Sequence, residues 1–105
     1  ADELAKRKVQ VIVHPTMQRA GGSMETANTL LATAALLRQK GVPVTICTGF
    51  EGYVPKTRNL RAEAAMAAAH GLGHAAALQA VTLDAAKLLG IDKDHGSIEV
   101  GKAAD

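Results

Sequence analysis

The sequence predicts an α/β fold built on a parallel βαβ unit over residues 9–48, and two observations support this. Two runs rich in β-branched residues, 9–14 and 42–47, flank a segment with apolar side chains at helical spacing. The second run is largely apolar, which is typical of a parallel strand buried on both faces. Because parallel strands need a crossover connection, the segment between them is expected to form a right-handed crossover helix.

Local signals place the elements before the second strand. Residues 1–8 carry acidic side chains first and basic ones last, as expected for the last turns of a helix. Pro15 ends the first strand. Ser23 can then cap a helix over residues 24–40, and Gly41 ends it.

The segment 49–90 is predicted to be a loop followed by helices. Helical patterns run over residues 59–70, 75–81 and 84–89. Asn59 can cap the first of these helices, while Gly71 and Gly90 supply the stops of the first and the last.

The predicted sheet is too small to enclose a core. Two parallel strands leave an unpaired edge on each side, and a strand buried on both faces needs neighbours that this sequence does not supply. Hydrophobic residues make up 48% of the 105 residues, but alanine dominates them and the only aromatic residues are one Phe and one Tyr. We therefore expect a thin core in at most one domain, as part of a larger sheet.

Composition argues against several classes of protein. The net charge is +2 with scattered basic residues, and no aromatic side chains are interleaved with them, so no nucleic-acid partner is expected. No segment has the roughly 18 apolar residues of a membrane span, so no membrane partner is expected either. The single cysteine, Cys47, cannot form a disulfide within the chain and is predicted to be a buried, inert thiol, which leaves the compartment open.

Candidate binding residues follow both predicted strands. Sites in parallel α/β folds form where the carboxyl ends of the strands meet. The side chains at these two ends that are expected to contact a substrate are His14, Thr16, Arg19, Tyr53, Lys56 and Arg58. The cationic members suit an anionic or carboxylate substrate, and a solvated loop is the alternative.

No motif for a metal or a phosphate occurs in the sequence. The patterns HxH, HExxH and CxxC are absent, so a complete metal site within this segment is not expected. Two glycines between His70 and His74 break the helical spacing that a metal-binding pair needs. Gly49 and Gly52 lack the spacing of a phosphate-binding loop.

The most specific motif lies in residues 77–105. A Thr-x-x-Ala-Ala-x-x-Leu-Gly core precedes Gly-Ser-Ile-Glu-x-Gly-Lys-x-Ala-Asp. The matching residues are Thr82, Ala85, Ala86, Leu89, Gly90, Gly96, Ser97, Ile98, Glu99, Gly101, Lys102, Ala104 and Asp105. This pattern resembles the end of the barrel in the amidohydrolase superfamily, metal-dependent hydrolases such as imidazolonepropionases, dihydroorotases and prolidase-like amidohydrolases.

The resemblance implies an incomplete TIM-type (β/α)8 barrel. The strands at 9–14 and 41–49 are similar to the seventh and eighth strands of the family, so the chain would contain the last two βα units. In the family, Thr82 would open the helix at the barrel base. The turn over residues 91–105, with a short strand at 97–100, would lead toward a small β-sandwich.

The resemblance also implies a gap in the chemistry. The eighth strand of the family typically ends in Thr-Asp, and that Asp binds the catalytic zinc and takes a proton from the attacking water. Gly49 stands at the matching position and can do neither. Glu51, two residues later, is the remaining candidate for a catalytic carboxylate. A divalent metal, zinc, is expected in a complete parent, with no ligands and no metal in this segment alone.

The implied function is that of a part of an amidohydrolase-like enzyme. Such an enzyme hydrolyses amide or cyclic amide C–N bonds of a small molecule with a metal-activated water, and this segment alone would be inactive. The alternative is a non-catalytic α/β module that completes its sheet by self-association or with another chain. Either the remaining barrel or a second copy is therefore expected as a partner.

Overall fold

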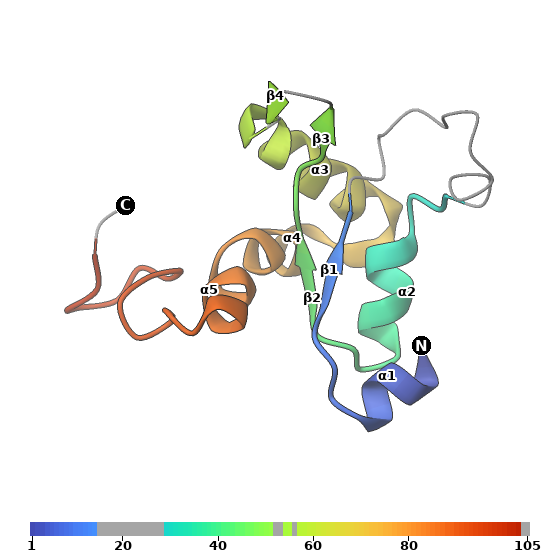
Figure 1. Cartoon of the computed structure of the whole chain (residues 1–105), viewed down its shortest axis with the longest axis horizontal. Coiled ribbons are helices and arrows are strands. Elements are labelled where there is room, and N and C mark those ends of the chain that lie inside the picture. Colours follow the sequence, from blue (N-terminus) through green and yellow to red (C-terminus); the bar gives the residue numbers. More distant parts are fainter. Residues whose placement is uncertain (15–28, 52–53, 56, 104–105) are drawn as a thin grey trace.

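The computed structural model spans the 105-residue chain and describes residues 1–14, 29–51, 54–55 and 57–103. In this part of the chain, helices pack against one face of a two-stranded parallel sheet (Figure 1). A short helix, α1 (Asp2–Lys6), precedes the sheet. None of the described helices is long and apolar enough to cross a membrane.

The two predicted strands pair in parallel, as their apolar runs indicated. Strand β1 (Val11–Val13) lies beside β2 (Val44–Ile46), and α2 (Thr33–Gln39) forms the helical part of the connection. The Val11 N–H donates to the Pro43 carbonyl at 2.9 Å, and the Cys47 N–H donates to the Val13 carbonyl at 3.1 Å. All residues of β2 are buried, in agreement with its continuous apolar pattern.

The helix predicted over residues 24–40 begins later than expected. Helix α2 starts at Thr33, and the described residues before it are not helical. The Thr33 hydroxyl donates to the Leu30 carbonyl at 2.6 Å, a local bond that competes with a continuing helix. The predicted cap Ser23 lies outside the described residues. The predicted end is right, because Gly41 takes a φ of +76°.

The segment after β2, predicted as a loop, contains a short antiparallel hairpin. Strand β3 (Phe50–Glu51) pairs with β4 (Val54–Pro55). Two residues separate the strands, which is the commonest length of a hairpin connection. Strands of two residues offer too little alternation for a sequence pattern to reveal them.

Helices and irregular turns make up the rest of the chain to Leu89. In order they are η2 (Thr57–Asn59), α3 (Leu60–Ala67), the π-helical turn η3 (Ala68–Leu72), α4 (His74–Val81) and α5 (Leu83–Leu89). Gly71 and Gly90 have φ values of +102° and +71°, so both predicted stops are confirmed.

The predicted side-chain cap of Asn59 is wrong. Its backbone is already helical, with φ −87° and ψ −3°, whereas a capping residue needs an extended backbone to turn its side chain onto the following N–H groups. Thr82 does stand immediately before α5, as predicted. Its hydroxyl, however, donates to the Leu78 carbonyl of the preceding helix at 2.7 Å.

The short strand predicted at residues 97–100 is also wrong. Ser97 lies in a bend and Val100 in a turn, the two residues between them have no regular structure, and no other described strand lies beside them to complete a ladder. The Lys102 ammonium closes the turn instead, donating to the Asp92 carbonyl at 2.7 Å and to the Ser97 hydroxyl at 2.6 Å.

The same turn lowers the pKa of the Glu99 carboxyl. The Ser97 hydroxyl donates a hydrogen bond to this carboxylate, and the Lys102 ammonium both donates to it and attracts its negative charge.

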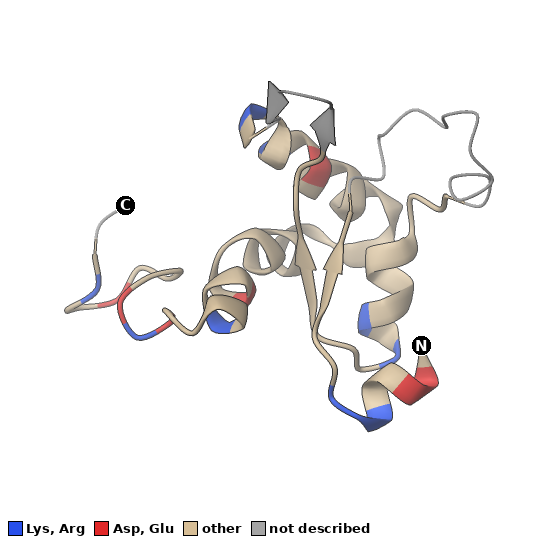
Figure 2. Ribbon diagram, in the orientation of Figure 1, with Lys and Arg blue, Asp and Glu red and all other residues tan. Residues whose placement is uncertain are grey.

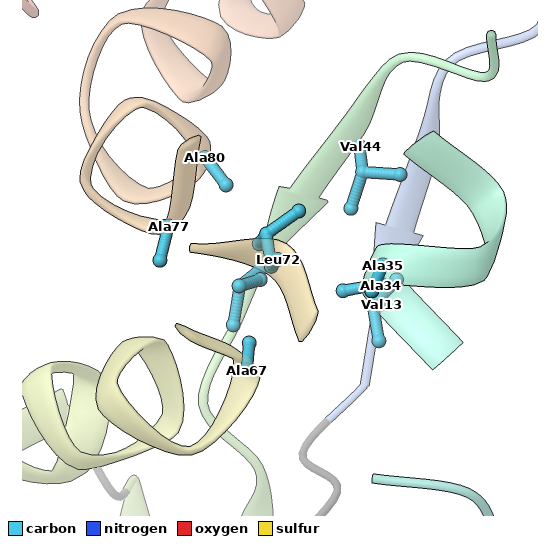
Figure 3. Packing of buried hydrophobic residues seen from close by; sticks show 9 residues of the cluster. Val13, Ala34, Ala35, Val44, Ala67, Leu72, Ala77 and Ala80 are labelled. Carbon is cyan, nitrogen blue, oxygen red and sulfur yellow. The ribbon is translucent and has the colours of Figure 1, made fainter. Parts of the chain in front are cut away.

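The core lies between the helices and one face of the sheet, and small side chains dominate it. Its buried members are Val13, Ala34, Ala35, Val44, Ile46, Ala67, Leu72, Ala77 and Ala80. Leu72 lies at the centre of the cluster (Figure 3). Of the described side chains, the largest that are fully buried are Val42 and Val44, which agrees with the thin core expected from the composition.

The opposite face of the sheet is not covered in the same way. Side chains alternate along a strand, so Ile12 and His14 lie on the face opposite Val11 and Val13. Ile12 is 52% exposed, although it stands in the middle of β1. Within the described part of the chain, this face therefore has an exposed apolar residue, Ile12, and no complete second layer.

Polar contacts at the amino end of the sheet hold α2 and α5 together. The Arg38 guanidinium binds the Asp84 carboxylate at 2.6 Å and donates to the Gln79 side chain at 3.2 Å. The Gln10 side chain donates to the Asp84 carbonyl at 3.0 Å. An open pocket of about 440 Å³ lies beside these residues, with Lys87 on its wall.

Gly96 is predicted to be the most sensitive glycine in the C-terminal turn. A Cβ at this position would stand 2.6 Å from the Ala86 Cβ, and its φ is +90°. Gly101 has a similar φ of +92° but open space around it, so it is the matched control. Gly96→Ala should lower the free energy of unfolding by about 2 kcal/mol or more, and Gly101→Ala by about 1 kcal/mol. Equal losses in chemical denaturation would contradict the close packing of Gly96 on α5.

The Arg38–Asp84 pair should contribute more to stability than an exposed pair. Its side chains are 34% and 16% exposed, against 71% and 64% for the Arg7–Glu3 pair of α1. Asp84→Asn should cost about 1–2 kcal/mol in urea unfolding, and Glu3→Gln less than about 0.5 kcal/mol. A loss of the same size in both variants would show that the Asp84 contact adds nothing beyond an exposed helix pair.

Candidate active-site edge

The carboxyl ends of β1 and β2 lie side by side, because the strands are parallel. His14 follows β1, and Cys47, Thr48 and Gly49 follow β2. We call these four residues the mouth edge. His14 is exposed and the other three are half-buried, so a molecule outside the chain can reach this edge. The sequence prediction that the two strand ends meet is thus confirmed.

The structure describes only some of the predicted substrate-binding residues. His14 is on the mouth edge, and Arg58 lies exposed in η2, beyond the hairpin. The other four predicted residues, Thr16, Arg19, Tyr53 and Lys56, lie outside the described residues. Glu51, the remaining carboxylate candidate, belongs to β3, where its backbone pairs with Val54.

Gly49 lies between β2 and β3 and brings no side chain to the mouth edge. A carboxylate here would be able to hold a cation or accept a proton from water, and hydrogen can do neither. The described residues at this edge therefore provide an imidazole, a thiol and a hydroxyl, but no carboxylate among the four.

The Cys47 thiol is held in its neutral form. It is half-buried rather than fully buried as predicted, and it donates to the Val13 carbonyl at 3.5 Å. Burial and the negative charge of Glu63 raise the pKa of Cys47 above its ordinary value. A raised pKa means little thiolate at neutral pH, which supports the prediction of an inert thiol.

Glu63 is a buried carboxylate whose charge acts on this edge, and no sequence motif indicated it. It lies in α3, which packs against β2, and it is only 5% exposed. The signal was present in the sequence, because Glu63 stands four residues before the buried Ala67 and so shares the inward face of the helix. A charged residue on the apolar face of a helix is unusual and indicates a specific role.

The donor set does not fit a metal ion. Among residues 1–14, 29–51, 54–55 and 57–103, no group of three or more His, Cys, Asp or Glu side chains could hold one. His70 and His74 are both exposed, and the left-handed Gly71 separates them. The residues at the mouth edge thus cannot complete the coordination of zinc by themselves.

Comparison with known proteins identifies the family. The family model described as "Amidohydrolase family" matches residues 2–105. The chain belongs to the amidohydrolase family. The superfamily resemblance read from the tail motif is therefore confirmed.

Similar proteins include bacterial imidazolonepropionases. The protein from Shewanella frigidimarina is 44% identical over 78 residues, which cover 73% of this chain and 19% of the relative. That from Pseudomonas savastanoi pv. phaseolicola is 40% identical over 78 residues, or 73% of this chain and 20% of the relative. The chain thus spans about a fifth of the length of the curated relatives that it matches.

A solved structure shares the fold of the chain. The crystal structure of an amidohydrolase from Thermotoga maritima matches it with a TM-score of 0.87 at 30% identity, over 99% of this chain and 26% of the other. This likeness implies a barrel-type fold of the TIM class, of which the present chain is a part. It also explains why the described strands form a pair rather than a closed sheet.

Proposed function

We propose that this chain is the C-terminal sector of an amidohydrolase-family enzyme that hydrolyses amide or cyclic amide C–N bonds in small molecules. The observation that carries the proposal is the mouth edge, where the carboxyl ends of two parallel strands meet in a chain of this family. Catalytic residues in barrels of this class come from the carboxyl ends of several strands. Residues 9–48 would supply the seventh and eighth strands, and residues 49–90 the helices that follow.

The two ends of the chain have separate roles in this proposal. Residues 1–8 would be the end of the helix before the seventh strand. Residues 91–105 would lead from the barrel base toward a small β-sandwich, with the turn around Lys102 as the connection. Zinc or another divalent metal, if it is bound by the complete enzyme, would have its ligands in the portion of the relatives that this chain does not span. The segment alone would then be inactive.

The substrate contacts in this proposal are His14, Thr16, Arg19, Tyr53, Lys56 and Arg58. Their chemistry supports an anionic substrate, because guanidinium and ammonium groups bind carboxylates with strong, charge-assisted hydrogen bonds. The relatives named imidazolonepropionases take their name from a compound that combines a cyclic amide with a carboxylate. A substrate of this kind fits both the family and the cationic side chains.

Gly49 leaves this chain without a carboxylate at the position where the family has its catalytic Asp. Without a carboxylate at this position, proton transfer from water needs another base. Glu51 is two residues away in β3 and is the substitute that we propose, although its strand pairs with β4. An enzyme with Gly49 is expected to be slow compared with one that has aspartate here.

A second candidate function is that of a non-catalytic module. The specific observation in its favour is that, among the described strands, β1 and β2 pair only with each other, so each has an outer edge. Self-association, or another chain, would complete such a sheet. In this case Gly49 and the incomplete donor set would carry no functional meaning.

A chimera would test the proposed function. In the Shewanella frigidimarina imidazolonepropionase, this chain would replace the corresponding segment, once with Gly49 and once with Gly49→Asp. Because general acid–base catalysis typically contributes 10² to 10⁴ in rate, we expect Gly49→Asp to raise kcat on imidazolonepropionate by about 10²-fold or more.

The matched control is the chimera with Gly49→Asn, which has the size of aspartate without its charge. It should stay as slow as the Gly49 chimera, and bound metal and the melting temperature should be measured on all three. Equal rates for Asp, Asn and Gly in folded chimeras would argue against an active-site position for residue 49. They would favour the module.

A further inference from the structure

We propose that Glu63 is a positioning residue that fixes the carboxyl end of β2 from the helix layer, and with it the mouth edge. The catalytic meaning of this role rests on the proposed function, since the mouth edge is the proposed site. The structural effect of Glu63 concerns only the contact between α3 and β2, and it can be tested without measuring enzyme activity.

The burial of Glu63 is the first argument. A carboxylate that is 5% exposed has lost most of its hydration, which costs free energy unless it interacts with groups around it. Other positions of α3, such as Ala62 and Ala65, are exposed and would accept a glutamate without this cost. The placement of the charge on the inward face therefore requires a specific reason.

The position of α3 is the second argument. This helix packs against β2, and Figure 2 shows the acidic segment that it carries. The charge of Glu63 acts on Cys47, the first residue after β2, which places the carboxylate near the carboxyl end of the strand rather than near its amino end.

The contacts of Cys47 extend the effect to the neighbouring strand. Its N–H and its thiol both donate to the Val13 carbonyl, at 3.1 and 3.5 Å. Val13 directly precedes His14, and Cys47 directly precedes Thr48. The neutral thiol therefore adds a second hydrogen bond between the two strand ends, and this bond is lost in a thiolate, which has no proton to donate to that carbonyl.

Thiol alkylation is the most direct test, since Cys47 is the only cysteine in the chain. The rate of reaction with iodoacetamide would be followed from pH 6 to 10 in the wild type, in Glu63→Gln and in Glu3→Gln. Glu63→Gln should lower the Cys47 midpoint, so that alkylation below the midpoint becomes about three- to tenfold faster. Glu3→Gln makes the same change of charge on the exposed Glu3 of α1 and should leave the profile unchanged.

The midpoint and the plateau rate together separate the two effects of the substitution. Greater exposure of Cys47 would raise the plateau rate at high pH as well as lower the midpoint, because burial also raises the pKa of Cys47. Loss of the Glu63 charge alone lowers the midpoint and leaves the plateau rate unchanged. His14 is the other titratable group on the mouth edge, and it is present in all three proteins, so its effect cancels. An unchanged midpoint in Glu63→Gln would overturn the inference.

A second measurement addresses the ordering of the mouth edge. Hydrogen exchange at the Cys47 amide, which donates to the Val13 carbonyl, should be about tenfold or more faster in Glu63→Ala. Exchange at Thr45 in β2 should be much less affected, and Glu63→Gln should lie in between, because glutamine keeps the size and hydrogen-bonding capacity. Equal acceleration at both amides would mean that Glu63 stabilises the whole fold and not this edge, which would also overturn the inference.

A test in the wild-type protein does not depend on whether the variants fold. The Thr48 and Gly49 amide shifts should follow the ionisation of the Cys47 thiol, and shifts that do not follow it would contradict the proposal. None of these measurements involves substrate. Their failure would remove the role of Glu63 and leave the hydrolase proposal to the chimeras.

Discussion

Parallel pairing of β1 with β2 is the interaction on which the other elements depend. Parallel strands cannot be joined by a tight turn, so the pairing requires the crossover that contains α2. The same pairing brings the carboxyl ends of both strands to one edge, where His14 and Cys47 become neighbours. The helices then cover one face of the pair and leave Ile12 on the other.

A core made mostly of alanine determines how closely these layers approach. Small side chains allow α2, α3 and α4 to lie near the strands, but they bury little apolar area. The fold therefore relies on contacts outside the core, such as the Arg38–Asp84 pair at the base and the close packing of Gly96 on α5. At the mouth edge, the negative charge of the buried Glu63 in α3 raises the pKa of Cys47 at the end of β2.

Patterns that repeat over several residues were predictable from the sequence, whereas single contacts were not. Runs of β-branched residues identified both strands, and the tail motif identified the family before any comparison. The start of α2 was wrong because the Thr33 hydroxyl binds a nearby carbonyl, a competition that periodicity does not register. Glu63 was missed because a lone charge on a helix normally faces water. At the candidate site, the sequence predicted that the two strand ends meet and that Gly49 provides no carboxylate. It did not predict the buried negative charge of Glu63 in α3.

The most direct test of the account is amide hydrogen exchange of the isolated chain, at a concentration where light scattering shows a monomer. It tests whether β1 and β2 form a two-stranded part of a barrel with unpaired outer edges. N–H groups alternate in direction along a strand, and those of Val11 and Cys47 point to the partner strand. The amides of Val13 and Cys47 should therefore exchange slowly, and those of Ile12 and Ile46, at the outer edges, quickly. Equally slow exchange at all four amides would mean that further strands complete the sheet. Equally fast exchange at all four would mean that β1 and β2 do not pair. Either result would contradict the account.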